Sequence, residues 1–357
     1  MAQRLTIRRI AELAGVSAGT VDRVIHNRGK VSPEALAAVQ AVLDKQAYQY
    51  NLHTSAVAFK KTKKSFWIAV GIPSSSKGEY WDLIRAGLEK AFTEYGDISI
   101  RSQYIYFDQF NSLSCRQAFE KIANLPSCSA VILGTTFVQE TRDLCEKLDK
   151  KKIPYVFVDG NVPDTHPLAC FMADQRSCGR LLARLMDGFT TDGAEIVAML
   201  PERVGTRLSN NSTIRLEAIR SYFKESGSGK ILKEVYFPTG NPEGARQAVS
   251  RFLRDNPKVK GIAVVISTGY LISDALSEAG ISGICVGGFD VTEGNTRCIR
   301  EETLDFLINQ HPEWQAFNAL ECLLHYLLYG ATDNELRTFL PIDIVFKENL
   351  PFWHDIL

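Results

Sequence analysis

Side chains suited to holding a small polar molecule follow several short apolar runs of this sequence. Asp159 ends the run PYVFVD, Ser267 follows GIAVVI, and Asp290 follows ICVGGF. Gln310 stands just after a further strand-like segment at 304–308. Carboxylates, hydroxyls and amides bond adjacent ligand hydroxyls with fixed geometry. One carboxylate after a strand is commonly a helix cap, whereas several polar groups at successive strand ends favour a polar ligand cleft.

An aromatic pair follows the first apolar run, FWIAVGI at 66–72. Tyr80 and Trp81 carry flat apolar faces that can cover the C–H face of a sugar ring. Lys77 and Glu79 flank this pair and add charge that can contact a ligand. The alternative interpretation is that both aromatic side chains are ordinary core residues.

A different chemistry is indicated near the N-terminus, where positive charge collects. Residues 1–64 contain 11 Lys and Arg against 4 Asp and Glu, and the remaining residues contain 30 against 37. The chain has zero net charge, although its first part is strongly basic. A basic segment on an acidic body favours a polyanionic partner for that segment alone.

The basic segment predicts three short helices. Apolar residues at helical spacing predict a first helix that begins after a Thr6 cap and ends at Gly15. Ser17 can cap a second helix, and Ser32 a third whose inner face is expected to include Leu36. The tight corner AGVS between the first two helices indicates a helix-turn-helix. The alternative is a generic three-helix core with basic side chains, which the agreement of corner, caps and charge disfavours.

In a helix-turn-helix the start of the second helix enters the major groove of DNA. Ala18 can contact a thymine methyl group there, and Gly19 lets the backbone come close. Arg23 can grip a guanine through two hydrogen bonds, which makes it the most informative side chain of this helix. Arg28 is expected to hold the phosphate backbone, as are His26 and the more distant His53.

The segment 48–65, YQYNLHTSAVAFKKTKKS, follows the third helix. Asn51 can cap a short helix over 53–58, and four lysines come after it. The segment is either a solvated linker or a hinge that becomes helical on DNA and inserts an apolar side chain into the minor groove.

From residue 66 onward the pattern changes to α/β. Short apolar runs at 66–72, 130–134, 154–159, 195–200, 261–266 and 284–289 are separated by helical segments such as 83–92, 178–189 and 245–255. Buried parallel strands that alternate with helices predict two doubly wound sheets, hence two lobes. Ligands of such sheets bind at the carboxyl ends of the strands. The Leu-rich stretch 317–330 is expected to be core rather than interface.

Other classes of function lack their motifs. No phosphate-binding loop, dinucleotide fingerprint or nucleophile elbow is present, and the six histidines are dispersed without metal-ligand spacing. We therefore expect no catalytic residue, no metal and no cofactor. The N-terminus does not read as a signal peptide, no apolar run is long enough to span a bilayer, and the eight scattered cysteines suit a reduced cytoplasmic protein.

The stretch IAELAGVSAGTVDRVIHNRGKVS, followed by YQYN and a Lys-rich segment, resembles the lac repressor family of bacterial regulators. The resemblance implies a helix-turn-helix domain at 1–50 and a hinge at 51–65. It implies base reading by Ala18, Gly19 and Arg23, and it places Val57 where much of the family has a Leu wedge. The expected DNA-binding residues are Thr6, Ser17, Ala18, Gly19, Thr20, Arg23, His26, Asn27, Arg28, Asn51, His53, Thr54 and Val57.

Residues 66–357 are similar to the periplasmic sugar-binding fold that this family uses as its sensor. The resemblance implies lobe 1 at about 66–161 plus 292–322, and lobe 2 at about 162–291 plus 323–357. It makes Tyr80 and Trp81 the pair that sandwiches a sugar ring. The expected ligand-binding residues are Lys77, Tyr80, Trp81, Asp159, Arg215, Ser267, Asp290 and Gln310.

Two departures bear on the ligand. Gly160 stands where ribose-type binders have an Arg, and Ser267 replaces a customary amide, so the ligand is not simply ribose. The sequence thus predicts a homodimeric, DNA-binding transcriptional repressor controlled by a sugar-like molecule. The alternatives are a nucleobase or sugar-acid effector in the same role, or a sugar-binding receptor without a regulatory role.

Overall fold

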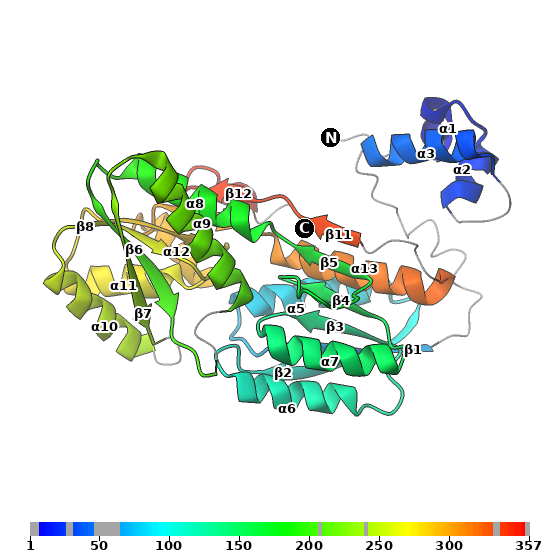
Figure 1. Ribbon diagram of the computed structural model, residues 1–357, viewed down its shortest axis with the longest axis horizontal. Coiled ribbons are helices and arrows are strands. Elements are labelled where there is room, and N and C mark those ends of the chain that lie inside the picture. The colour runs from blue at the N-terminus through cyan, green and yellow to red at the C-terminus, as the bar shows by residue number, and fades with distance from the viewer. Residues whose placement is uncertain are drawn as a thin grey trace. The chain divides into compact units, whose positions relative to one another are not determined.

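The computed structural model describes residues 7–25, 31–45, 65–205, 209–238, 242–330 and 336–353. The chain divides into two compact units, Met1–Lys60 and Lys61–Leu357. Figure 1 shows a small helical unit and a two-lobed α/β unit.

The described part of the first unit contains three helices, α1 (Ile7–Ala14), α2 (Ala18–Ile25) and α3 (Pro33–Lys45). Gly15 adopts a positive φ of 65° after α1, and the Val16 N–H bonds the Ala11 carbonyl, so the predicted corner is confirmed. Ser17 Oγ accepts from the Thr20 N–H at 3.1 Å, which confirms the predicted cap of α2. Ser32 Oγ likewise accepts from the Ala35 N–H at 3.3 Å.

The core of this unit contains Ile10, Ala11, Val21 and Val39. The prediction that Leu36 lies on the inner face of α3 is wrong, since its side chain is 48% exposed. Val39 is buried and Val42 is partly buried, so the face of α3 that packs on the core is rotated by one position away from Leu36. The sequence of so short an apolar helix does not fix this rotation, because two neighbouring helix faces are about equally apolar.

The second unit contains two six-stranded sheets with strand orders β11-β5-β4-β3-β1-β2 and β12-β10-β9-β8-β6-β7. The strands of the first sheet are β1 (Ser65–Pro73), β2 (Ser99–Phe107), β3 (Ala130–Gly134), β4 (Tyr155–Val158), β5 (Ala169–Met172) and β11 (Leu336–Phe339). Those of the second are β6 (Glu195–Pro201), β7 (Ile231–Phe237), β8 (Val259–Val264), β9 (Cys285–Phe289), β10 (Phe306–Asn309) and β12 (Asp343–Val345). All described pairings are parallel except that of β10 with β12. The predicted doubly wound architecture is confirmed.

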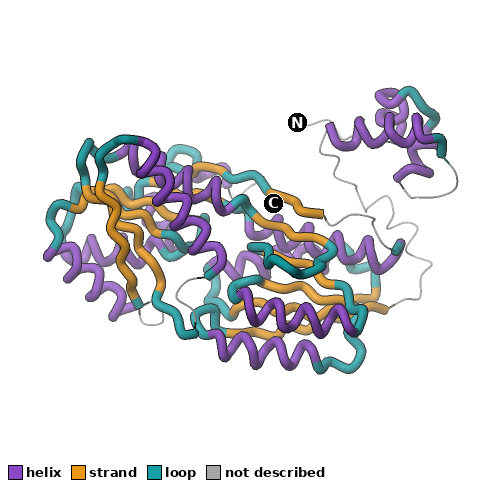
Figure 2. The backbone as a smooth tube through the Cα atoms, viewed as in Figure 1, coloured by secondary structure: helices purple, strands orange, loops and turns teal. Residues whose placement is uncertain are grey.

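Helices cover both faces of each sheet (Figures 1 and 2). Lobe 1 has α5 (Tyr80–Glu94), α6 (Ser112–Ala123), α7 (Val138–Lys150) and α13 (Pro312–Tyr329). Lobe 2 has α8 (Gln175–Phe189), α9 (Asn210–Ser226), α10 (Pro242–Asp255), α11 (Gly269–Ala279) and α12 (Glu293–Arg300), and η1 (Leu350–Trp353) follows β12. None of the described helices combines the length and the apolarity needed to cross a membrane.

Successive side chains of β6 pack into two different hydrophobic cores, one on each face of the sheet. Ile196 and Ala198 pack with α8 and α9, whereas Val197 and Met199 pack with α10, α11 and α12. Successive side chains of a strand point to opposite faces, so a strand covered on both sides must be apolar throughout. The Leu-rich α13 is also core as predicted, because Ala319, Leu320, Leu323 and Leu324 are fully buried.

Three strands correct the predicted lobe boundaries. The residues of β5 and β11 fall in the range predicted for lobe 2 but belong to the first sheet. Those of β10 fall in the range predicted for lobe 1 but pair with β9 in the second sheet. The backbone neighbour of a strand decides its sheet, and an apolar run does not encode that neighbour. The chain therefore passes between the lobes after β5, after β10 and after β11.

Candidate functional site

The centre of the candidate ligand site is Asp290, directly after β9. Its side chain is fully buried, and its backbone has a positive φ of 63°. It accepts hydrogen bonds from Ser267 Oγ at 2.6 Å and from Gln310 Nε2 at 2.9 Å. Burial raises the pKa of the Asp290 carboxyl to about 6, although these hydrogen bonds and the Arg215 charge lower it. Three predicted ligand residues thus meet in one hydrogen-bonded group.

Arg215 on α9 joins the same group. Its Nη2 donates to Gln310 Oε1 at 2.6 Å, its Nη1 to the Val265 carbonyl at 2.7 Å, and its Nε to Gln175 Oε1 at 2.7 Å. The guanidinium carbon lies 3.9 Å from the centre of the Phe289 ring, a favourable cation–π arrangement. Arg215 is therefore held in one orientation, with its positive charge beside two buried carboxyls.

Asp159, directly after β4, is the corresponding residue of lobe 1. It also has a positive φ, 74°, and it accepts from Tyr80 Oη at 2.7 Å. Burial raises the pKa of the Asp159 carboxyl above its usual value and raises that of the Tyr80 phenol well above its own. Asn211 Nδ2 of lobe 2 donates to the Asp159 carbonyl at 2.9 Å. The two strand-end aspartates, both in an unusual backbone conformation, thus flank the junction of the lobes.

Tyr80 and Trp81 are buried but do not form a sandwich. Their rings meet edge to face, with centroids 5.2 Å apart and an interplanar angle of 89°. Trp81 packs against Gly134, where an added Cβ would lie 2.8 Å from the indole, and its Nε1 donates to Gln109 Oε1. In this conformation a sugar ring does not fit between the two aromatic faces.

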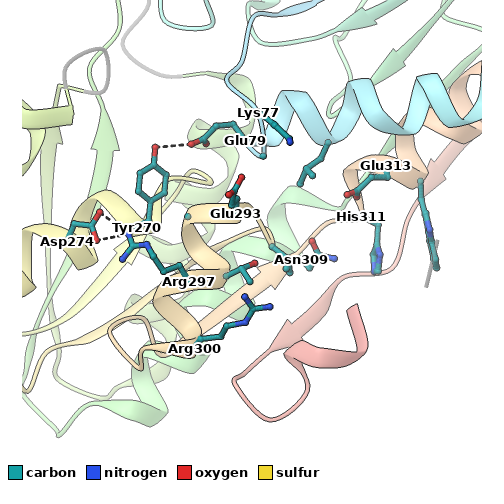
Figure 3. A pocket seen from close by; sticks show the side chains of 16 residues that line it. Lys77, Glu79, Tyr270, Asp274, Glu293, Arg297, Arg300, Asn309, His311 and Glu313 are labelled. Atoms are coloured by element: carbon teal, nitrogen blue, oxygen red, sulfur yellow. Dashed lines mark hydrogen bonds and ion pairs between the residues drawn. The ribbon is translucent and has the colours of Figure 1, made fainter. Parts of the chain in front are cut away.

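Lys77 lies apart from the buried group. It lines a groove of about 770 Å³ between α5, α11, α12 and the start of α13 (Figure 3). Glu79 also lines this groove and accepts from Tyr270 Oη at 2.9 Å. Burial raises the pKa of Glu313, another lining residue, to about 7. Of the eight predicted ligand residues, six converge, whereas Lys77 lies apart and Trp81 contacts the group only through the edge of Tyr80.

In the first unit, the expected DNA-reading side chains lie on the exposed face of α2. Ser17, Ala18, Gly19 and Arg23 are exposed, and Thr20 is partly so. Arg23 folds back on its own helix, with Nε donating to the Gly19 carbonyl at 3.1 Å. The guanidinium therefore lies over the first turn of α2, the part of a recognition helix that meets base edges.

The remaining expected DNA contacts lie outside the described residues. They are Thr6, His26, Asn27, Arg28, Asn51, His53, Thr54 and Val57.

Several amide side chains of the ligand site were not predicted. Gln175 links Arg215 and Gln310, and Gln315 Oε1 accepts from the Asp159 N–H at 2.9 Å. Asn211 precedes Arg215 by four residues on α9 and so shares its face, a signal present in the sequence. Gln175 and Gln315 share no helix face with a predicted ligand residue. Each lies near the start of a helix that begins just after the chain crosses from one lobe to the other, so only the fold brings it to the site. No cluster of His, Cys, Asp and Glu able to hold a metal ion occurs in the described parts of the chain.

Comparison with known proteins agrees with this geometry. Residues 68–331 match the periplasmic binding protein domain, and residues 6–51 match the bacterial regulatory proteins of the lacI family. Most of the chain thus belongs to the first family, in the two-lobed form described above. The protein as a whole is a member of the lacI family: a DNA-binding transcriptional regulator in which this sensor domain follows a helix-turn-helix.

Individual relatives are similar over much of the chain. The chain is 25% identical to the HTH-type transcriptional regulator GalR of Escherichia coli, over 70% of this chain and 67% of the relative. It is 24% identical to the ribose operon repressor of Halalkalibacterium halodurans, over 79% and 81% of the two chains. A crystal structure described as a LacI transcriptional regulator from Bacteroides fragilis superposes with a TM-score of 0.76 at 27% identity, covering 82% of this chain and all of that one.

Proposed function

We propose that this regulator is a repressor that binds its operator as a homodimer and is controlled by a sugar-like molecule held between the two lobes. The observation that carries the proposal is the buried polar group around Asp290, Arg215 and Asp159, which draws on both lobes at the ends of their strands. The relative named for the ribose operon supports a sugar effector. The predicted cytoplasmic location remains a prediction.

The donor and acceptor types suit a polyol. The carboxyls of Asp159 and Asp290 accept from ligand hydroxyls, and Arg215 and Gln310 can turn donors toward them. These side chains already bond one another, so a ligand must exchange with existing contacts as the lobes part and close. We propose that this movement alters the segment 51–65 and hence the fit of two copies of α2 to two half-sites. A coupling of about 1–3 kcal/mol changes operator affinity about 5–150-fold.

The test uses the full chain and an operator duplex selected from a random library. Fluorescence anisotropy would be measured with and without a panel of pentoses, hexoses and their sugar acids. We expect salt-sensitive, sequence-specific binding whose affinity changes at least fivefold with one sugar. A full chain that is folded and binds no duplex selectively would refute the regulator, and one that binds DNA but responds to no panel member would refute the sugar switch.

Arg23 provides the matched variant. Loss of a bidentate guanine contact costs about 1–3 kcal/mol, so Arg23→Ala should weaken operator binding and relax specificity at one base pair. Arg251→Ala, which removes an exposed arginine of α10, should leave the affinity unchanged. Equal effects of the two changes would show that Arg23 acts only through net charge.

A further inference from the structure

A second polar group lies where the loop after β6 meets lobe 1. Arg203 of this loop places its guanidinium carbon 4.3 Å from the centre of the Phe137 ring, and its Nη2 approaches the Thr136 carbonyl at 3.4 Å. The next residue, Val204, exchanges backbone hydrogen bonds with Phe110 at 2.7 Å and Ser112 at 3.1 Å. A partly buried side chain of lobe 2 is therefore held against lobe 1, beside main-chain contacts between the two lobes.

Four buried polar atoms at this junction have no hydrogen-bond partner. They are Arg203 Nε, Thr135 Oγ1, Thr136 Oγ1 and Asn211 Oδ1. Thr135, Thr136 and Asn211 are each less than 10% exposed. Buried polar groups almost always find a partner, and leaving one unsatisfied costs about 1–3 kcal/mol. Four such atoms on segments that meet at the contact between the lobes indicate that another molecule supplies the missing partners.

Gly160 shows that two of these atoms face the same point. A Cβ added at Gly160 would lie 2.7 Å from Thr135 Oγ1 and 2.9 Å from Asn211 Oδ1. Thr135 belongs to lobe 1 and Asn211 to α9 of lobe 2. Asn211 also bonds the Asp159 carbonyl, so this second group adjoins the proposed effector site and is not a separate one.

The charge at Arg203 is incompletely balanced. Within the described parts of the chain, no carboxylate forms an ion pair with Arg203, and the nearby Glu140 is already paired with Arg116 at 3.1 Å. Burial lowers the pKa of the Arg203 guanidinium to about 10, because nearby acidic groups offset only part of its desolvation. A partly buried cation without an ion-pair partner loses hydration that no opposite charge replaces, and a planar carboxylate is the partner that best matches a guanidinium.

We propose that Arg203 is an effector-recognition residue and that the effector is an acidic sugar, a polyol carrying one carboxylate. The carboxylate pairs with Arg203 when the lobes close on it. Thr135 and Thr136 donate to or accept from neighbouring hydroxyls, and Asn211 Oδ1 accepts from one. The proposal rests on the proposed function, since it names the chemical class of the molecule bound between the lobes.

Matched sugar pairs test the proposal on the full-length protein. Isothermal titration calorimetry would compare galactose with galacturonate, glucose with glucuronate, and a panel of aldoses with their aldonic acids. We expect the acid of at least one pair to bind about tenfold or more tightly than its neutral partner. Arg203→Gln should abolish that preference, and Arg203→Lys should keep part of it, because the charge remains while the planar fork is lost.

Two controls separate recognition from folding. Arg220→Gln removes an arginine of α9 that pairs with Glu234 at 2.6 Å and lies outside the junction, and it should retain the full preference. Thr136→Val removes one hydroxyl at nearly constant side-chain volume. It should lower the affinity for the acidic sugar without changing the melting temperature of the protein by more than a few degrees.

The outcomes distinguish this proposal from the function on which it rests. If a neutral sugar binds as tightly as its acid and alters operator affinity, the acidic effector is wrong and the sugar switch stands. If Arg203→Gln weakens neutral and acidic sugars equally, Arg203 is only a lobe-closing contact and the proposal fails. If no neutral or acidic sugar binds, both proposals fail.

Discussion

The buried carboxyl of Asp290 makes a sharp prediction about the dependence of stability on pH. Asp290→Asn removes the titrating group while keeping the size of the side chain. In the wild type, burial raises the folded-state pKa of this group from 3.8 to about 6. The folded protein therefore holds this proton more tightly than the unfolded chain does, and the resulting stability is present below about pH 4 and lost as the pH rises through about 6.

The size of the effect follows from the shift. A shift of about two pKa units corresponds to about 3 kcal/mol, at about 1.4 kcal/mol per unit. About 2 kcal/mol of this falls above pH 4.5. Because Asn does not titrate, the stability of Asp290→Asn relative to wild type should rise by about 2 kcal/mol between pH 4.5 and pH 7.5. The prediction concerns only how the difference in unfolding free energy changes with pH. Its value at any one pH also depends on how the Asn side chain meets the donors of Ser267 and Gln310.

Urea unfolding followed by tryptophan fluorescence measures this difference in the right part of the chain. All four tryptophans, Trp67, Trp81, Trp314 and Trp353, follow residue 61, so the signal reports the two-lobed unit. Glu217→Gln, which removes an exposed carboxyl on α9, is the control for loss of one negative charge. Parallel decline of Asp290→Asn and wild type as the pH rises would refute the reasoning, as would a fall in the stability of Asp290→Asn relative to wild type.

Three further predictions concern packing, capping and hydrogen bonding. Gly87→Ala should destabilise the two-lobed unit by about 3 kcal/mol, because a Cβ at Gly87 would lie 2.3 Å from the Glu313 carbonyl oxygen. The control Gly188→Ala has open space around it and should not lower the melting temperature; equal melting temperatures for the two variants would contradict the close approach of α5 and α13. Ser17→Ala should destabilise α2 by about 1 kcal/mol and speed amide exchange in its first turn about fivefold, measured by hydrogen-exchange mass spectrometry; unchanged exchange would show that the cap contributes nothing. Tyr80→Phe should cost about 1–3 kcal/mol in urea unfolding, because the Asp159 carboxyl loses its 2.7 Å donor; a cost below about 0.3 kcal/mol would mean that Asp159 finds another donor.

The fold was predictable for most strands that are buried on both faces, although the four-residue β5 is buried throughout and was not predicted. β1, β3, β4, β6, β8 and β9 all appear in the sequence as short apolar runs. β2 and β7 escaped this criterion because both are edge strands with mixed polar and apolar side chains. An edge strand covered less completely needs no continuous apolar run, so its sequence does not separate it from a loop.

The candidate site was predictable where a residue directly follows a strand or shares a helix face with another. Asp159 and Asp290 meet the first condition, since parallel strands end at the same edge of a sheet. Arg203 meets neither condition. Its environment exists only because the loop after β6 reaches the opposite lobe, and the distance between two lobes is a property of the whole fold. The edge-to-face arrangement of Tyr80 and Trp81 has the same origin, because Gly134 and Gln109 come from other segments.

The passage of the chain between the lobes has a consequence for synthesis on the ribosome. Lobe 1 needs α13, which packs on α5 and ends at Tyr329, so it stays incomplete until almost the entire polypeptide has been made. Helices α1, α2 and α3 have all been made once the chain reaches residue 45, and domains generally fold as they emerge, the N-terminal one first. During translation the DNA-binding helices are therefore complete before the ligand-binding lobes. A translation stop before α13 leaves these helices attached to an incomplete lobe 1.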